Sequence, residues 1–271
     1  MELDSIQIPL VFEQMILAFE EYYRLFYLEM IRLNSDVLNA RINTFLDLLH
    51  NLSRTNDKCN QMRVVIGVVS LHKFGFRDFH LLSTIYDRTI PQKDEQFIAF
   101  SSWGASQLLH HHRSDQVNYT LHLFGRVLGW INAEGRRKRL LAAVYMLSNL
   151  FQTACNVLIP QSPLFITSLW KIVENPSIPV IREAANSISM FVRLLSRYCS
   201  SEMTNYTDIL TKMWMILLYS DENMKIYTAS IFISTLIKGH PSYFVELFNV
   251  LIDLASSNIC QSDEYVQIGS F

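Results

Sequence analysis

The stretch VIREAANSISMFVRLLSRY, residues Val180–Tyr198, carries apolar side chains at successive steps of three and four positions. This spacing gathers them on one face of an α-helix, because the helix turns once every 3.6 residues. Ala185 adds a small side chain to that helix, which allows a neighbouring backbone to come close. The stretch therefore predicts an amphipathic helix that packs against another helix through a contact at Ala185.

The same spacing recurs along almost the whole chain, and no alternation of strand length stands out. Short polar or proline-containing segments separate the apolar runs, as expected for helices with short connections. The chain is therefore predicted to be all-α, with about 11–12 helices in antiparallel pairs. The predicted helices are Ile8–Leu33, Val37–Leu52, Asn60–Phe74, Arg77–Arg88, Asp94–His111, Asp115–Ile131, Gly135–Cys155, Leu164–Glu174, Val180–Tyr198, Tyr206–Leu218, Asn223–Lys238 and Pro241–Ser256.

The second helix of each pair follows a turn, and these turns recur at intervals of 37, 40, 43 and 44 residues, near Asp57, Asp94, Glu134, Ser177 and Asp221. Each second helix also holds a small residue at a similar depth, namely Gly67, Ser102, Ala143, Ala185 and Ser230. Helix pairs bury their remaining apolar face by stacking on the next pair, and small residues permit the close approach. A period of about 40–47 residues is typical of HEAT and armadillo repeats.

The sequence therefore predicts a HEAT/armadillo-type α-solenoid over residues 1–258, with the weakest repeat pattern in the first 55 residues, and a short C-terminal tail over 259–271. The alternative is a globular all-α domain in which the spacing of the turns is accidental. A solenoid aligns the five small residues along one series of contacts, whereas a globule scatters them.

The composition of the chain narrows the class of its partners. Half of the 271 residues are hydrophobic, 18% are charged and the net charge is −2, so a protein partner is favoured over nucleic acid. No apolar run approaches the ~18–20 residues that span a bilayer, and the four cysteines form no closely spaced pair. We therefore expect no transmembrane segment and a reducing compartment. The expected location is the cytoplasm, including the surface of endomembranes through bound partners, or the nucleus.

Two motifs resemble those of a known family. RVLGWINAEGRR, residues 126–137, contains Trp130 and Glu134, and IREAA, residues 181–185, follows about 45 residues later. In this order they resemble the N-terminal HEAT repeats of the target-of-rapamycin (TOR) kinases, members of the phosphatidylinositol-3-kinase-related kinase family. In that family a Trp-containing helix leads into an Asn-Glu-Gly-Arg-Arg turn, and the next unit carries an Ile-Arg-Glu turn. The resemblance covers about residues 94–195.

The resemblance implies a curved solenoid that helps to dimerise the kinase complex and holds accessory subunits. We therefore expect a non-catalytic scaffold in growth and nutrient signalling that binds a large, Raptor-like subunit. Two alternatives stay open. One is an unrelated HEAT-repeat transport or assembly factor, and the other is a piece of a TOR-like serine/threonine kinase without its kinase domain.

Enzymatic chemistry is not expected from this sequence. TOR kinases keep their catalytic domain at the far C-terminus, and the Gly-rich loop and metal-binding motifs of an ATP site are absent here. Three adjacent histidines, His110–His112, do not predict a metal site, because consecutive helical residues point about 100° apart. We therefore expect no catalytic residue, no metal and no cofactor.

A run of four cations opens one predicted helix: Arg136, Arg137, Lys138 and Arg139. A helix N-terminus already carries partial positive charge, so this placement is locally unfavourable, and Glu134 offsets part of it. At least one of these cations is expected to pair with the next unit, near Glu174 or Glu183. The alternative is a partner contact: an acidic protein edge, acidic lipid headgroups or a nuclear-import receptor.

The remaining candidate contacts lie on predicted helices or beside them. Trp130 falls on an apolar stripe and is expected in the core rather than in a ligand cage. Asp57 and Arg63 match the acidic and basic positions of HEAT units, where such residues hydrogen-bond across units as a ladder. Arg182 and Glu183 of the second motif are candidates for contacts between repeats or with a partner.

The predicted first helix, Ile8–Leu33, has an apolar face too wide to be covered from one side. A terminal repeat normally needs a polar outer face. This end is therefore expected to be capped by a partner or by self-association.

Overall fold

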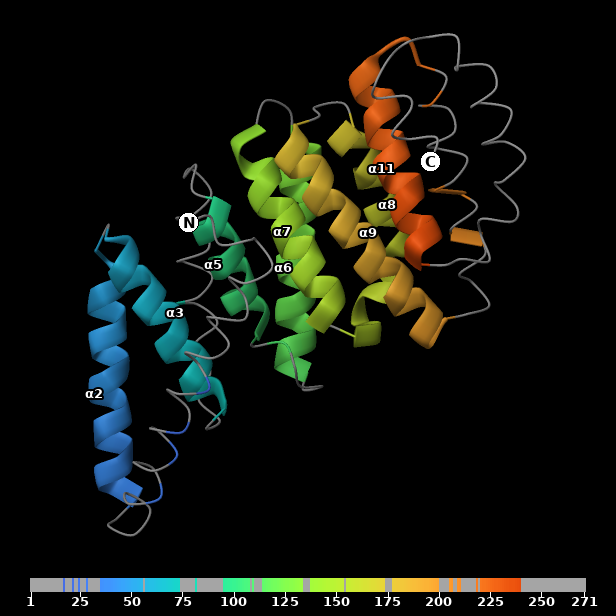
Figure 1. Cartoon of the computed structure of the whole chain (residues 1–271). Helices are drawn as coiled ribbons and strands as arrows, with labels where there is room; N and C mark the ends of the chain where they lie inside the picture. Colours follow the sequence, from blue (N-terminus) through green and yellow to red (C-terminus); the bar gives the residue numbers. More distant parts are fainter. Residues whose placement is uncertain are drawn as a thin grey trace. The chain divides into compact units, whose positions relative to one another are not determined.

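The computed structural model of the chain (Figure 1) describes residues 35–55, 57–73, 95–107, 109, 114–133, 137–153, 155–173, 177–199 and 220–239, and the single positions 17, 21, 24, 28, 81, 205, 206, 209, 210 and 218. All regular secondary structure in this part of the chain is helical, which confirms the all-α prediction. The chain divides into two compact units, Met1–Gln116 and Val117–Phe271, called unit 1 and unit 2 below.

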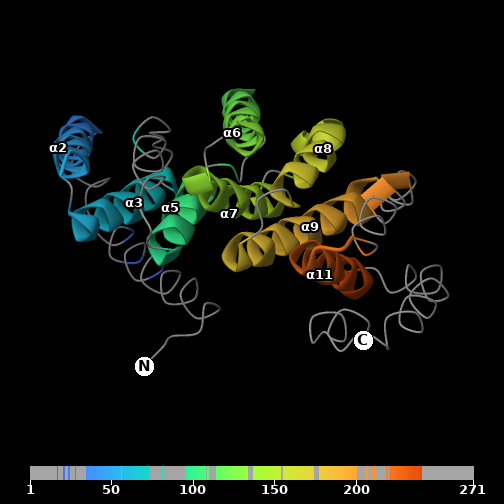
Figure 2. The same ribbon diagram turned by 90° about the horizontal axis from the view of Figure 1, so that it is seen from above.

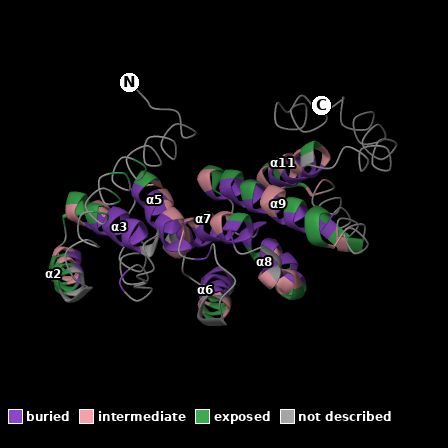
Figure 3. Cartoon of the chain, turned by 90° about the horizontal axis from the view of Figure 1, so that it is seen from below, coloured by how far each residue is buried: buried purple, intermediate pink, exposed green. Residues whose placement is uncertain are grey.

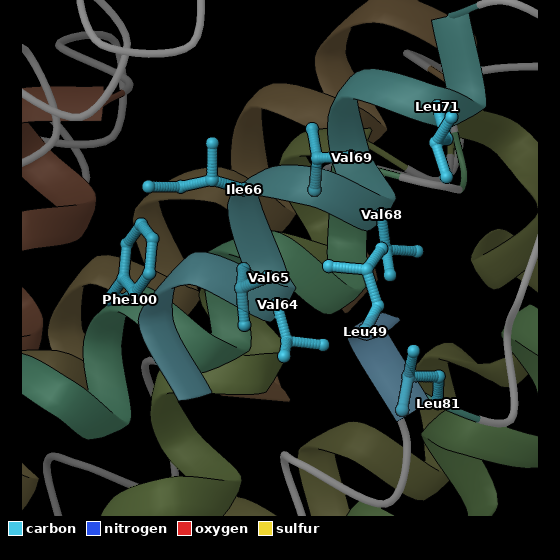
Figure 4. Close-up of a cluster of buried hydrophobic side chains, with 9 residues drawn as sticks. All are labelled: Leu49, Val64, Val65, Ile66, Val68, Val69, Leu71, Leu81 and Phe100. Atoms are coloured by element: carbon cyan, nitrogen blue, oxygen red, sulfur yellow. The ribbon is translucent and has the colours of Figure 1, made fainter. Parts of the chain in front are cut away.

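Unit 1 is built around α3 (Lys58–Lys73), which contacts both α2 (Ser35–Ser53) and α5 (Glu95–Gln107). Residues 64–71 of α3 are buried without a break, so two turns of this helix are covered on every side. Their aliphatic side chains form one cluster with Leu49 of α2 and Phe100 of α5 (Figure 4). Helix α3 is therefore the central element of the described part of unit 1.

Two glycines mark close approaches between the helices of unit 1. A Cβ atom on Gly67 of α3 would lie 2.8 Å from Cδ2 of Leu49, and one on Gly104 of α5 would lie 2.2 Å from Cγ1 of Val65. Both distances are shorter than ordinary contacts, so a side chain at either position would force its neighbour to shift; the Leu49 contact involves the far end of a flexible side chain, and the Val65 contact is the tighter one. The sequence predicts the small residue at Gly67. In α5 it points to Ser102, which is buried, but the tightest approach lies at Gly104.

Unit 2 contains most of α6 (Ser114–Asn132), then α7 (Arg137–Thr153), the 3-10 helix η1 (Cys155–Gln161), α8 (Ser162–Val173), α9 (Ile178–Tyr198) and α11 (Asn223–Gly239). Helix α9 contacts both α7 and α11, and α8 and η1 also pack on it. Figures 1 and 2 show α7, α9 and α11 side by side in this order. Helix α9 is therefore the central element of the described part of unit 2, as α3 is in unit 1.

Phenylalanines from successive helices form the aromatic core of unit 2. The ring of Phe165 in α8 lies 4.6 Å from that of Phe151 in α7 and 4.9 Å from that of Phe191 in α9, centroid to centroid. The rings of Phe151 and Phe191 are 5.3 Å apart, and Phe124 of α6 reaches Phe151 at 6.2 Å. Tilted and edge-to-face rings at these distances attract each other beyond their apolar burial. One cluster therefore joins four helices.

The helices predicted as the second members of their pairs correspond to α3, α5, α7, α9 and α11. Their predicted small residues are all buried: Gly67, Ser102, Ala143, Ala185 and Ser230. In unit 2 the last three lie on helices that contact one another in chain order. Burial of these positions is therefore confirmed. Four predicted helices lie mostly or wholly outside the described residues: Ile8–Leu33, Arg77–Arg88, Tyr206–Leu218 and Pro241–Ser256.

The segment between α7 and α8 differs from the prediction. The sequence predicts a helix up to Cys155 and a connection at 160–163, whereas α7 ends at Thr153, η1 covers Cys155–Gln161 and α8 begins at Ser162. Pro160 lies inside η1. Proline has no N–H, and in an α-helix its ring would meet the carbonyl four residues earlier, so the tighter 3-10 turn takes the place of an open connection.

Candidate interaction surface

Helices α7 and α9 are joined by hydrogen bonds between buried or half-buried serines. The hydroxyl oxygens of Ser148 in α7 and Ser187 in α9 lie 2.9 Å apart. The Ser187 hydroxyl also lies 3.0 Å from the Val144 carbonyl oxygen, and the Ser148 hydroxyl 3.3 Å from the Glu183 carbonyl oxygen. The partners are 39, 43 and 35 residues apart in sequence. These separations are close to the intervals of 37–44 residues between the turns that the sequence predicts.

A second bond of this kind joins α6 and α8. The amide nitrogen of Asn132 donates to the Ser168 hydroxyl at 3.1 Å, across 36 residues. The sequence does not single out these polar residues, because a serine within an apolar stripe is common in helices that make no such bond. Their one visible signal is the recurrence of a serine about one repeat later, as at Ser148 and Ser187.

Trp130 belongs to the core of α6, as predicted. Its side chain is 8% exposed, and the guanidinium carbon of Arg126, one turn earlier, lies 5.2 Å from its ring centroid. A cation over an indole face is attracted by the ring electrons. Trp130 is therefore a packing residue of α6, and Arg126 covers one face of its ring.

The basic run lies at the start of α7, which begins at Arg137. Arg139 is half-buried. Glu134 and Arg136 lie outside the described residues, as do the side chains of Arg137 and Lys138. The helix start is confirmed, and both the pairing of these cations between repeats and their contact with a partner stay predictions.

Asp57 and Arg63 form local hydrogen bonds at the start of α3. The Asp57 carboxylate accepts hydrogen bonds from the backbone N–H groups of Cys59 (3.3 Å) and Asn60 (3.1 Å), and Arg63 donates to the Asn60 side chain at 3.1 Å. Asp57 is thus the N-cap of α3, which occupies free N–H groups at the helix start. These local bonds replace the expected ladder between units. A partner contact at the two exposed side chains stays a prediction.

Arg182 and Glu183 are neighbours in α9 with opposite surroundings. Glu183 is 8% exposed, and its carboxylate accepts a hydrogen bond from the Asn186 side chain at 2.9 Å. Arg182 is exposed, and its guanidinium group has no hydrogen-bond or ion-pair partner among the described residues. Adjacent helical residues point about 100° apart, so one of the two side chains is buried while the other is exposed. Glu183 belongs to the interior of unit 2, and Arg182 belongs to its surface.

Four described positions of the predicted first helix share one helical face, since they are spaced by four, three and four residues. Leu17 and Leu28 are 48% and 52% exposed. Between them Arg24 and Glu21 form an exposed ion pair at 2.7 Å. The two exposed leucines agree with an apolar surface left over at this end, and its covering by a partner or a second copy stays a prediction.

One face of α6 is exposed and carries two glycines. Exposed positions follow one another along it at Leu121, His122, Gly125 and Gly129. A Cβ atom built on either glycine would have no atom within 4 Å, in contrast to Gly67 and Gly104. Among the described residues, therefore, no contact requires glycine at these two positions.

Replacing Gly125 or Gly129 with alanine is expected to stabilise the protein by about 0.8–1.0 kcal/mol each. The reason is that alanine is that much more favourable than glycine inside a helix, and the added methyl group meets nothing. Urea unfolding followed by circular dichroism measures the change. Either substitution lowering the stability would mean that another segment packs closely on this face of α6.

Two further features, a metal site and a membrane-spanning helix, are not found among the described residues. No group of three or more His, Cys, Asp or Glu side chains among them could hold a metal ion. None of the helices in the described ranges combines the length and the apolar character needed to cross a bilayer. A scan against models of known protein families and a search of curated proteins found no match to this chain.

Proposed function

We propose that the chain is a HEAT-type helical-repeat scaffold that binds another protein and performs no catalysis of its own. The observation that carries this proposal is the set of hydrogen bonds between helices whose residues lie 35–43 positions apart, at the interval of one repeat. Repeat proteins gain their stability from contacts between adjacent units. Bonds that recur at the repeat interval, in both α6–α8 and α7–α9, are what such an array needs.

Exposure of whole helix faces supports a binding role. Helix α9 buries one side in the core of unit 2 and exposes Arg182, Asn186 and Arg193 on the other. Helix α6 behaves alike, with its glycine-bearing face exposed. Stacked repeats present such faces as extended surfaces, and these surfaces are the usual binding sites of α-solenoids.

The partner that we propose is a large accessory subunit of the Raptor type. This part of the proposal follows from the resemblance of residues 126–137 and 181–185 to the N-terminal repeats of TOR kinases. Two placements agree with it: Trp130 packs in the helix that leads to the first turn, and Arg182 of the second motif faces solvent.

The test uses the full chain and a purified Raptor-type subunit, with association measured by interferometry. We expect a dissociation constant of about 1 μM or lower, corresponding to roughly −8 kcal/mol. A matched measurement with a nuclear-transport GTPase distinguishes the TOR-like role from a transport factor. Binding of the GTPase but not of the subunit would refute the TOR-like role, and measurable ATP hydrolysis would refute the non-catalytic one.

A further inference from the structure

Basic residues dominate three helices of unit 2. The Lys and Arg residues of α7, α9 and α11 are Arg137, Lys138, Arg139, Arg182, Arg193, Arg197, Lys225 and Lys238. By sequence, Glu183 is the only acidic residue in these helices, and it is buried. The whole chain has a net charge of −2. Lys225 is paired with Glu222, just before α11, and the remaining cations give this group of helices an excess of positive charge, although the protein as a whole is slightly acidic.

Three of these cations form a row along one face of α9. Arg182, Arg193 and Arg197 are all exposed, and exposed residues recur along α9 in Figure 3. Their spacing of 11 and 4 residues places them within about 60° around the helix axis. Along the axis the row extends for about 22 Å, with about 16 Å between Arg182 and Arg193 and about 6 Å between Arg193 and Arg197. We call these three residues the arginine row.

No carboxylate neutralises the arginine row in the described part of the chain. Its guanidinium groups form no ion pair there, and Arg197 packs over the ring of Tyr198 at 5.5 Å. Like charges at i and i+4 repel each other, which applies to Arg193 and Arg197. Glu183 cannot relieve this repulsion, because its carboxylate is buried and bonded to Asn186. The row therefore presents charge without compensation among the described residues.

We propose that the arginine row binds an extended acidic segment of a partner protein. Each guanidinium group can hold a carboxylate through two parallel hydrogen bonds. An extended peptide rises about 3.3 Å per residue, so about seven residues cover the row. Acidic side chains at alternate positions would face α9 together. This inference rests on the proposed function in taking the chain as a protein binder, and it adds the chemistry of the bound segment.

The number and surroundings of the cations favour a peptide over other polyanions. Proteins that bind duplex DNA through its backbone can make about 6–10 phosphate contacts, and polybasic membrane sites use about 4–8 cations. The row supplies three cations; of the other cations in these helices, Lys225 is paired with Glu222 and Arg139 is half-buried. The exposed side chains between them, Asn186 and Ser196, are polar hydrogen-bonding groups rather than the apolar groups that enter a bilayer.

The test measures binding of a fluorescein-labelled 11-residue peptide of alternating Glu and Ser, by anisotropy, to the full chain. The double variant Arg182→Gln/Arg193→Gln is compared with Arg41→Gln/Arg54→Gln, which removes the same charge from exposed positions of unit 1. We expect the first variant to weaken binding at least tenfold and the second to change it less than twofold. The same peptide with Gln in place of Glu is expected not to bind. Circular dichroism verifies that both variants remain folded.

Equal losses in the two variants, or equal binding of the Gln peptide, would overturn the proposal. So would preferential binding of phosphatidylserine vesicles or of a single-stranded oligonucleotide. The Raptor-type subunit separates this inference from the proposed function. If the subunit binds the wild type and the Arg182→Gln/Arg193→Gln variant equally, the arginine row is refuted and the scaffold stands. If the peptide binds but the subunit does not, the Raptor-type partner is refuted and the arginine row stands.

Discussion

Replacing Phe191 with alanine is expected to lower the free energy of unfolding by about 3–5 kcal/mol. The Phe191 ring is fully buried and contacts the rings of Phe151 and Phe165, so the substitution removes its apolar burial and leaves a cavity among three helices. Whole-domain stabilities are commonly about 5–15 kcal/mol, so this loss is a large share of the total. Urea unfolding followed by circular dichroism measures it.

The matched control is Arg193→Ala, two residues away on the exposed side of the same helix. It is expected to change the stability by no more than about 0.5 kcal/mol, as surface substitutions usually do. A loss below about 1 kcal/mol for Phe191→Ala, or losses of similar size at both positions, would contradict the packing of α7, α8 and α9 around these rings.

The second large effect is expected at Gly104, where alanine is predicted to destabilise the protein by about 2 kcal/mol. Overpacking typically costs about 1–3 kcal/mol, and a Cβ atom 2.2 Å from Cγ1 of Val65 falls at the upper end. The better helix propensity of alanine returns about 1 kcal/mol. Val65 is 1% exposed and β-branched, so it has little freedom to turn away. Unfolding in urea measures the net effect.

Two further variants show whether the contact with Val65 is the cause. Gly67→Ala is the control, because its nearest neighbour is the mobile end of Leu49, and we expect a change within about 1 kcal/mol. Combining Gly104→Ala with Val65→Ala removes the clashing methyl group, so the double variant should lose less than the sum of the two single losses. Strict additivity would show that the two residues do not meet.

The periodicity of the sequence predicts the helices and their order but not their detailed contacts. Each second helix was expected to bury a small residue, and Gly67 and Ala185 are indeed buried. In α5 the pattern could not distinguish Ser102 from Gly104, because most of that helix is buried and both positions qualify. Only the location of Val65 in the neighbouring helix decides between them.

The candidate surface was predictable in the same limited sense. The motif at residues 181–185 singles out Arg182 and Glu183 together, but the 100° between adjacent helical residues sends one outward and the other inward. The sequence predicts that Asp57 bonds to the next repeat. Its carboxylate instead accepts hydrogen bonds from the free N–H groups at the start of α3, which are adjacent in the chain. The predicted helix Val180–Tyr198 already places the three arginines of the row on one face, but the sequence does not show that no carboxylate among the described residues pairs with them.

The central claim, that the repeats stack in series, is tested most directly by distances between spin labels at equivalent helix ends. The labels are attached near the starts of second helices, at the exposed positions Cys59 of α3, Ile178 of α9 and Asn223 of α11. Ile178 or Asn223 is replaced by cysteine to take the second label, and the other native cysteines are replaced by serine. Packed helices lie about 8–10 Å apart, so three and four steps predict about 24–30 Å for Cys59–Ile178 and about 32–40 Å for Cys59–Asn223. A Cys59–Asn223 distance no longer than Cys59–Ile178, near the roughly 26 Å typical of a compact globule of this size, would contradict the account.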